Sequence, residues 1–156
     1  MEEHYWSLII EEGWVQAAIW KVDQETKKAI LVAKSNSTAW ADREELVNAS
    51  DTALSVVLQN MPAEFQEPAK TVFGVPPSWV SEGQITKEHI VDFKEICSKL
   101  DLVPTGFVVL PEAIAHYYKI KDGTPLNAVI VGVGKELVDL TIFKLGNLIG
   151  TTTVAR

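Results

Sequence analysis

Two stretches of this chain, about 122 residues apart, follow the same pattern, and this repeat constrains the possible folds more than any other feature. Residues 8–22 and 129–145 each contain an apolar run, a short turn with glycine, and a second apolar run. Each second run ends in an aliphatic, an aromatic, a lysine and an aliphatic residue, at 19–22 and at 142–145. With one further apolar run after each, both copies are predicted to be three-stranded antiparallel meanders. An accidental likeness between two meanders is the alternative.

Between the two copies, helical and strand patterns alternate. Residues 42–61 carry apolar residues every three or four positions and stop at Pro62, which predicts a helix. Asp42 and Glu45 have capping-box spacing at its start. Further patterns predict a strand at 70–75, a helix after Thr86, a strand at 107–110 and a helix at 112–119. The order predicts an α/β fold, a mixed sheet with helices packed on it, followed by the second meander.

Two local expectations follow from composition within these elements. The strand at 107–110 is apolar throughout, which is typical of a strand covered on both faces, and residues 104–106 read as a turn before it. Trp79 follows two prolines, and packing in the core is the default for it, with an exposed contact as the alternative.

Charge and cysteine content exclude several classes of protein. The 156 residues carry a formal net charge of −7, which disfavours general binding to nucleic acid. The single cysteine, Cys97, cannot form an internal disulfide, and a cytoplasmic location is expected. No apolar run reaches the roughly 20 residues of a membrane span. The histidines His4, His89 and His116 lack metal-ligand spacing, so no metal site is predicted.

The layout resembles the actin-like, RNase H-type ATPase superfamily, in which two similar halves face each other across a nucleotide cleft. The stretches that carry the resemblance are residues 72–76, 100–109, 111–115 and 128–134 with 140–148. Within the superfamily they look most similar to the pilus assembly protein PilM and the cell-division protein FtsA. The resemblance implies an actin-like first subdomain at 1–122 and the opening strands of a second, incomplete subdomain at 123–156.

The resemblance also places two phosphate loops, and both depart from the family pattern. In the first, Glu11 and Gly13 align with the acidic, glycine-rich turn, but a second glutamate, Glu12, stands where phosphate would approach. The carboxylate pair Glu11 and Glu12 could instead hold a divalent ion, although an exposed acidic turn is preferred. The candidate nucleotide-binding residues, if nucleotide binds at all, are Glu11, Gly13, Gly132, Gly134 and Lys135.

In the second loop the family acid aligns with Val131. Asp139 is a candidate replacement, although a plain surface acid is the preferred interpretation. The resemblance therefore implies a degenerate, non-catalytic scaffold or adaptor that needs no cofactor and binds a protein partner, such as a short segment of a membrane protein. The alternative is an ATPase that binds ATP and magnesium and needs the missing half. A metal-dependent nuclease is a third reading, for which Glu11, Glu12 and Asp139 are the candidate carboxylates.

The second meander is also expected to leave strand edges and apolar surface uncovered, because residues 126–154 are too few for a complete domain. We therefore predict a homo-oligomer, a dimer or swapped pair, that forms through these residues.

Overall fold

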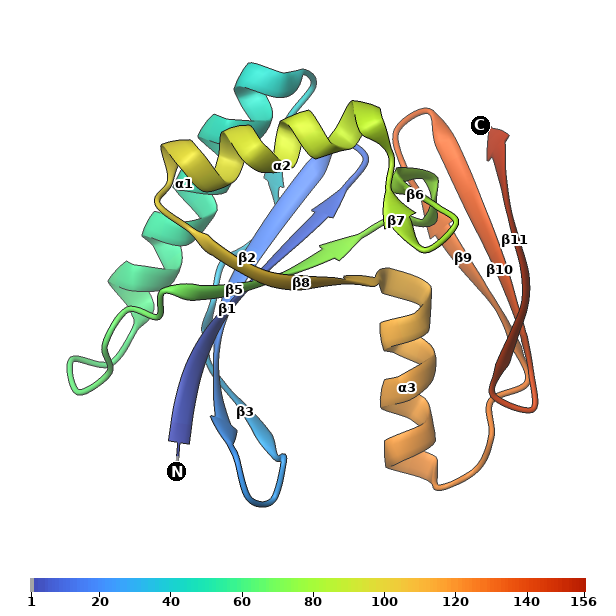
Figure 1. Ribbon diagram of the computed structural model, residues 1–156, viewed down its shortest axis with the longest axis horizontal. Coiled ribbons are helices and arrows are strands. Elements are labelled where there is room, and N and C mark those ends of the chain that lie inside the picture. Colours follow the sequence, from blue (N-terminus) through green and yellow to red (C-terminus); the bar gives the residue numbers. More distant parts are fainter. Residues whose placement is uncertain (1) are drawn as a thin grey trace.

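The computed structural model describes residues 2–156. Of the first subdomain predicted at 1–122, residue 1 lies outside the described residues. A mixed sheet with the strand order β3-β2-β1-β5-β8 forms the centre of this unit (Figure 1). β1, β2 and β3 pair antiparallel, whereas β5 is parallel to β1 and β8 is parallel to β5. The strands are β1 (Glu2–Glu11), β2 (Trp14–Asp23), β3 (Ala29–Lys34), β4 (Thr38–Ala39, paired with β2), β5 (Lys70–Val75) and β8 (Val103–Val109). The predicted α/β class is confirmed.

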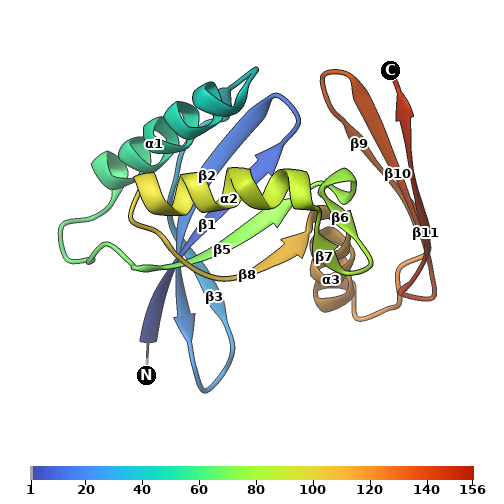
Figure 2. The same cartoon turned by 45° about the horizontal axis from the view of Figure 1, so that its top comes forward.

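Two helices cover one face of this sheet, and a third follows its last strand (Figure 1). α1 (Arg43–Asn60) and α2 (Lys87–Lys99) lie together on one face, and α3 (Leu110–Asp122) continues directly from the end of β8 (Figures 1 and 2). Between β5 and α2 the chain forms the short helix η1 (Pro77–Trp79) and a small hairpin of β6 (Val80–Ser81) and β7 (Gln84–Ile85). No sequence pattern predicted this hairpin, because its strands have only two residues each.

A second sheet follows α3 and contains β9 (Ala128–Val133), β10 (Leu137–Lys144) and β11 (Asn147–Ala155). Its order, β11-β10-β9, matches the order β3-β2-β1 of the first meander. The strand pairing shifts register between Ile19 and Trp20 in the first meander and between Ile142 and Phe143 in the second. These are the residues that the sequence repeat aligns with each other. A shared irregularity at aligned positions supports duplication over accidental likeness, because bulges are specific features of a fold.

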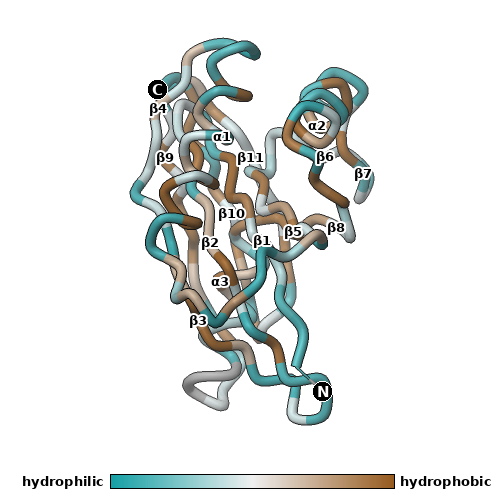
Figure 3. The backbone as a smooth tube through the Cα atoms, turned by 90° about the vertical axis from the view of Figure 1, so that its left-hand side faces the viewer, coloured by the Kyte–Doolittle hydropathy of each residue, from teal (hydrophilic) through white to brown (hydrophobic). Residues whose placement is uncertain are grey.

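The core lies between the first sheet and the two helices on its face. Trp6, Leu8 and Ile10 alternate along β1 and are fully buried. Their cross-strand partners on β2 and the facing residues of α1 are buried with them: Val15, Ala17, Ile19, Leu46, Ala53 and Val57. Figure 3 shows that hydrophobic residues also run along β10 of the second sheet.

The start of α1 follows the predicted capping pattern with one change. The Asp42 carboxylate accepts the Glu45 amide at 2.9 Å, as expected for an N-cap. The Glu45 carboxylate reaches back to the amide of Ala41 at 2.8 Å, one residue before the cap. Thr86 occupies the N-cap position of α2 as predicted, but its side chain makes no capping bond.

Two local predictions were wrong and one alternative is excluded. β8 begins at Val103 and includes residues 104–106, so these residues form no turn. β8 is the last strand of its sheet, and edge strands tolerate proline because one side of their backbone needs no ladder partner. β8 is also not covered on both faces, because Val108, within the predicted strand at 107–110, is 41% exposed. Trp79 is buried, which confirms core packing and excludes the exposed contact.

Candidate functional site

The candidate site begins at the turn between β1 and β2. Glu11 is the last residue of β1, and Glu12 and Gly13 form the turn before β2. Gly13 has a φ of +86°, which side chains rarely adopt, so glycine is needed there. The Gly13 carbonyl accepts the Trp40 amide at 3.1 Å, which fixes the turn to the segment that precedes α1.

The corresponding turn of the second meander lies between β9 and β10. The Gly134 amide donates to the Leu137 carbonyl at 2.9 Å and closes this turn. Arg156 holds it from the other side, since its amide donates to the Glu136 carbonyl at 2.8 Å and its Nη1 to the Gly134 carbonyl at 3.4 Å. Gly132, predicted to lie in the same turn, instead belongs to β9, opposite Asp139 of β10.

The two turns are in direct contact. Glu12 Oε2 accepts the amides of Glu136 at 3.0 Å and of Leu137 at 2.8 Å, across 124 and 125 residues of sequence. Gly134 makes room for this carboxylate, because a Cβ there would lie 2.1 Å from Glu12 Oε2. A Cβ on Gly13 would in turn lie 3.4 Å from Lys135 Cβ. The aligned glycines of the two copies thus each face the other copy's turn.

The carboxyl groups of Glu11, Glu12 and Asp139 lie close together at the contact between the two turns. Burial, and to a smaller extent the neighbouring charges of Asp139 and Glu12, raise the pKa of Glu11 to about 7. Asp139 is buried and accepts a hydrogen bond from the Thr153 hydroxyl. The preferred interpretation of Asp139 as a surface acid was therefore wrong. The alternation of polar and apolar residues along the chain could not predict the burial of Asp139, because this burial depends on how the second sheet lies relative to the first.

The structure therefore brings Glu11, Gly13, Gly134 and Lys135 to one place and leaves Gly132 within a strand. The sequence indicated Glu12 as an obstacle to phosphate and as a candidate metal-binding carboxylate, whereas it is the residue that joins the two turns. Within residues 2–156, no group of three or more histidine, cysteine or acidic side chains is arranged to hold a metal ion. None of the helices in that range has the length and apolar character of a membrane span.

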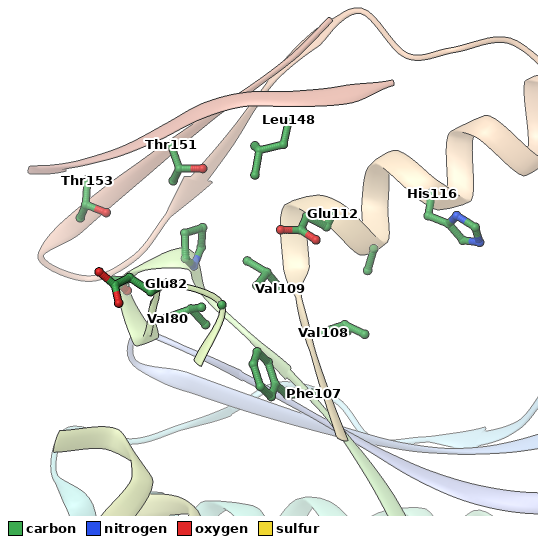
Figure 4. A pocket seen from close by; sticks show the side chains of 14 residues that line it. Val80, Glu82, Phe107, Val108, Val109, Glu112, His116, Leu148, Thr151 and Thr153 are labelled. Carbon is green, nitrogen blue, oxygen red and sulfur yellow. The ribbon is translucent and has the colours of Figure 1, made fainter. Parts of the chain in front are cut away.

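A cleft of about 1040 Å³ opens between the second sheet and the end of the first, and its lining contains no residue of the two turns. Thr151, Thr153 and Leu148 project into it from β11, and the β6–β7 hairpin and the junction of β8 with α3 form the opposite wall (Figure 4). Two carboxylates reach it, Glu82 from the hairpin and Glu112 from the first turn of α3. The remaining lining is largely apolar: Val80, Phe107, Val108, Val109 and Leu148.

No protein-family model matches the sequence, and no curated protein matches it. Solved structures do match the fold. The ethanolamine utilization protein EutJ from Carboxydothermus hydrogenoformans superposes with a TM-score of 0.64 at 13% identity, covering 97% of this chain and 52% of that one. MreB5 of Spiroplasma citri bound to ADP gives a TM-score of 0.59 at 12% identity, with coverage of 97% and 52%.

Component A of (R)-2-hydroxyglutaryl-CoA dehydratase from Acidaminococcus fermentans gives a TM-score of 0.53 at 14% identity, covering 97% of this chain and 47% of that one. These matches show that the chain has the actin-like ATPase fold, and at such identities they show the fold alone. The chain spans about half the length of the structures it matches.

Proposed function

We propose that this chain is a non-catalytic scaffold of the actin-like fold, related to PilM and FtsA, which binds a short apolar and basic segment of a membrane-associated partner. The observation that carries the proposal is the charge of the cleft. Its lining includes the carboxyl groups of Glu82 and Glu112 and the imidazole of His116, and no lysine or arginine is among the described residues that line it. A triphosphate requires cations or amides at close range, and two carboxylates repel it.

The contact between the two turns supports the same conclusion. The amides of Glu136 and Leu137, which point between the turns, are already bonded to the Glu12 carboxylate. Glu11 and Asp139 place two more carboxyl groups next to this contact. Phosphate oxygens would have to displace one carboxylate and approach the others, which is unfavourable without a cation.

The cleft suits an extended peptide better than a nucleotide. Phe107, Val109 and Leu148 provide an apolar surface, and Thr151 and Thr153 provide hydroxyl groups along β11. Apolar side chains bury surface on such a floor, while carboxylates at the rim select basic residues. The acidic net charge of the chain also favours the approach of a basic segment.

Fluorescence anisotropy with labelled synthetic peptides tests this proposal. A set of peptides that combine apolar residues with lysine or arginine is compared with the same peptides carrying glutamate at the basic positions. We expect saturable binding only for the basic set, and an affinity at least about tenfold lower for the double substitution Glu82→Gln and Glu112→Gln. Glu64→Gln, at an exposed site far from the cleft, is the matched control and leaves the affinity unchanged. Equal affinity for the basic and the acidic sets overturns the proposal.

ATP binding is the second candidate function, and two observations favour it. MreB5, which shares the fold, is bound to ADP in its structure. In this chain Gly134 and Lys135 retain the small residue and the cation of a phosphate loop. Isothermal titration of the chain with magnesium-ATP separates the candidates. The scaffold proposal expects no measurable heat of binding, and a micromolar affinity that Gly134→Asp abolishes establishes nucleotide binding instead.

A further inference from the structure

β8 leaves one long edge of the first sheet without a partner strand. It is the last strand in the order β3-β2-β1-β5-β8, and among the described strands it pairs only with β5. An edge strand presents a row of N–H and C=O groups that can pair with another chain. Five of its residues are exposed: Val103, Pro104, Thr105, Gly106 and Val108. This edge is therefore open to an extended segment from outside.

A groove of about 550 Å³ lies beside this edge, between β8, α2 and the β6–β7 hairpin (Figure 2). We call it the α2–β8 groove. Its lining is apolar and largely aromatic: Phe73, Ile85, Ile90, Phe93, Cys97 and Phe107. Ile90 is 43% exposed, although it belongs to the apolar stripe of α2. Exposed apolar surface next to a free strand edge is typical of a binding site for a segment of another chain.

Gly106 lies within this edge, where the contacts of the chain itself do not require glycine. Its φ is not positive, and nothing lies within 4 Å of a Cβ built on it. The β5–β8 pairing shifts register just before it, but a bulge without a positive φ accepts other residues. Glycine weakens a strand, and one use of a strand glycine is the close approach of another backbone. Gly106 therefore fits an edge that a partner strand approaches.

The charge of the groove indicates which segment it accepts. Among the described residues that line it, only Lys94 of α2 is charged. Lys94 is exposed, and none of the described ion pairs uses it. A carboxylate on the incoming segment would complement this charge. β8 itself contains no acidic residue, so the β8 edge of a second copy would leave Lys94 unpaired.

We propose that β8 and the α2–β8 groove bind an extended, apolar and acidic segment of a partner protein by strand addition. The added strand pairs with the outer edge of β8 from Gly106 onward, because Pro104 has no N–H to donate. One large apolar side chain enters the groove. A carboxylate two positions away lies on the same face of the added strand and pairs with Lys94.

The α2–β8 groove is adjacent to the cleft, since Gly83 and Phe107 line both. The two sites select opposite charges, because acidic groups line the cleft and a lysine lines the groove. Strand addition to β8 therefore does not depend on what occupies the cleft.

Fluorescence anisotropy with labelled, threonine-rich peptides of about eight residues tests the proposal. Each probe carries one phenylalanine and an aspartate two positions before or after it. We expect saturable binding of at least one probe, with a dissociation constant of about 10–100 μM. Lys94→Glu should lower this affinity at least about tenfold, and a probe with lysine in place of aspartate should recover it. Lys34→Glu, at an exposed residue of β3, is the matched control and leaves the affinity unchanged.

Two further changes test the strand pairing itself. A probe methylated at alternate backbone nitrogens cannot donate to an edge strand, so it should bind at least about tenfold more weakly. Gly106→Val should weaken binding as much without lowering the thermal midpoint, because a Cβ there meets nothing and β-branched residues suit strands. Gly150→Val, at a glycine of β11 with the same open space, is the matched control and keeps the affinity.

The absence of saturable binding by every probe overturns the proposal. Equal affinity of the methylated probe also overturns it, because the peptide would then dock through side chains alone. A dimer in sedimentation velocity that Gly106→Val dissociates would show that a second copy occupies this edge instead. The double substitution Glu82→Gln and Glu112→Gln should leave the binding of these probes unchanged, which separates this result from the test of the cleft.

Discussion

Glu11 is an acid whose ionisation opposes the folded state. It ends β1 beside Asp139 and Glu12, and burial with these like charges raises its pKa from about 4.5 to about 7. A raised folded-state pKa in an acid means that the protonated form is favoured on folding. The stability that protonated Glu11 contributes is fully present below about pH 4.5 and is lost as the pH rises through 7.

We therefore expect Glu11→Gln to flatten the pH dependence of unfolding. The free energy of unfolding of the unaltered chain should fall between pH 5 and pH 8, and the variant should exceed it at pH 8 by up to about 3 kcal/mol, since one pKa unit corresponds to about 1.4 kcal/mol. Urea unfolding at pH 5, 6, 7 and 8 measures this, with the exposed Glu64→Gln as control. A gap between the unaltered chain and Glu11→Gln that stays constant with pH contradicts the assignment.

Gly134 allows a second prediction at this scale. In Gly134→Ala the new Cβ would meet the Glu12 carboxylate, so Glu12 must move and its two bonds to the turn are lost. We expect a loss of about 1–3 kcal/mol in the free energy of unfolding. Gly150→Ala is the matched control, because nothing lies within 4 Å of a Cβ there. In a double-mutant cycle, Glu12→Ala should remove most of the Gly134→Ala effect, and simple additivity of the two would exclude the contact.

At the scale of elements, Asp92 connects the two helices on the sheet. Its buried carboxylate accepts bonds from Arg43 at the start of α1 and faces His89 Nδ1 at 3.1 Å, and the His89 ring stacks on Trp79 at 4.1 Å. Asp92→Asn removes the charge that both partners face. We expect it to lower the free energy of unfolding by about 1–3 kcal/mol, measured by urea unfolding, whereas Asp51→Asn on the exposed side of α1 has little effect. Equal effects of the two substitutions would show that Asp92 does not join the helices.

Elements whose signals are local were predictable, and those that depend on distant partners were not. The capping pair Asp42 and Glu45 located the start of α1, and the repeat predicted a second meander that has a bulge at the aligned residues. The edge position of β8 is set by strand order, which no local pattern contains. In the candidate site, glycine and acidic residues in the sequence predicted the positions of both turns. The bond from Glu12 to an amide 125 residues later could not be predicted, because it depends on the packing of the two sheets.

At the scale of the whole molecule, the second sheet has two unequal faces. Asp139, Thr141 and Phe143 alternate on one face of β10 and are buried. The opposite face is aliphatic and partly or fully exposed, and register places its residues side by side: Val129, Val131, Val133, Val138, Leu140, Ile142 and Val154. Lys144, at the end of β10, lies on the same face by alternation, and the aliphatic part of the face beyond it can pack against a copy of itself despite the net charge of −7. An exposed patch of this kind is typical of an interface.

The predicted homo-oligomer therefore remains a proposal with a specific surface, the aliphatic face of β9, β10 and β11. We expect the chain to be a dimer by sedimentation velocity at micromolar concentration. Val131→Lys places a charge at the centre of this face, opposite Leu140, and should shift the chain to a monomer because an unpaired charge cannot be buried there. Ile30→Lys, at a residue of β3 that is 61% exposed, is the matched control and should leave the dimer intact. A chain that sediments as a monomer, or a dimer that Ile30→Lys disrupts and Val131→Lys does not, would show that self-association does not use this face.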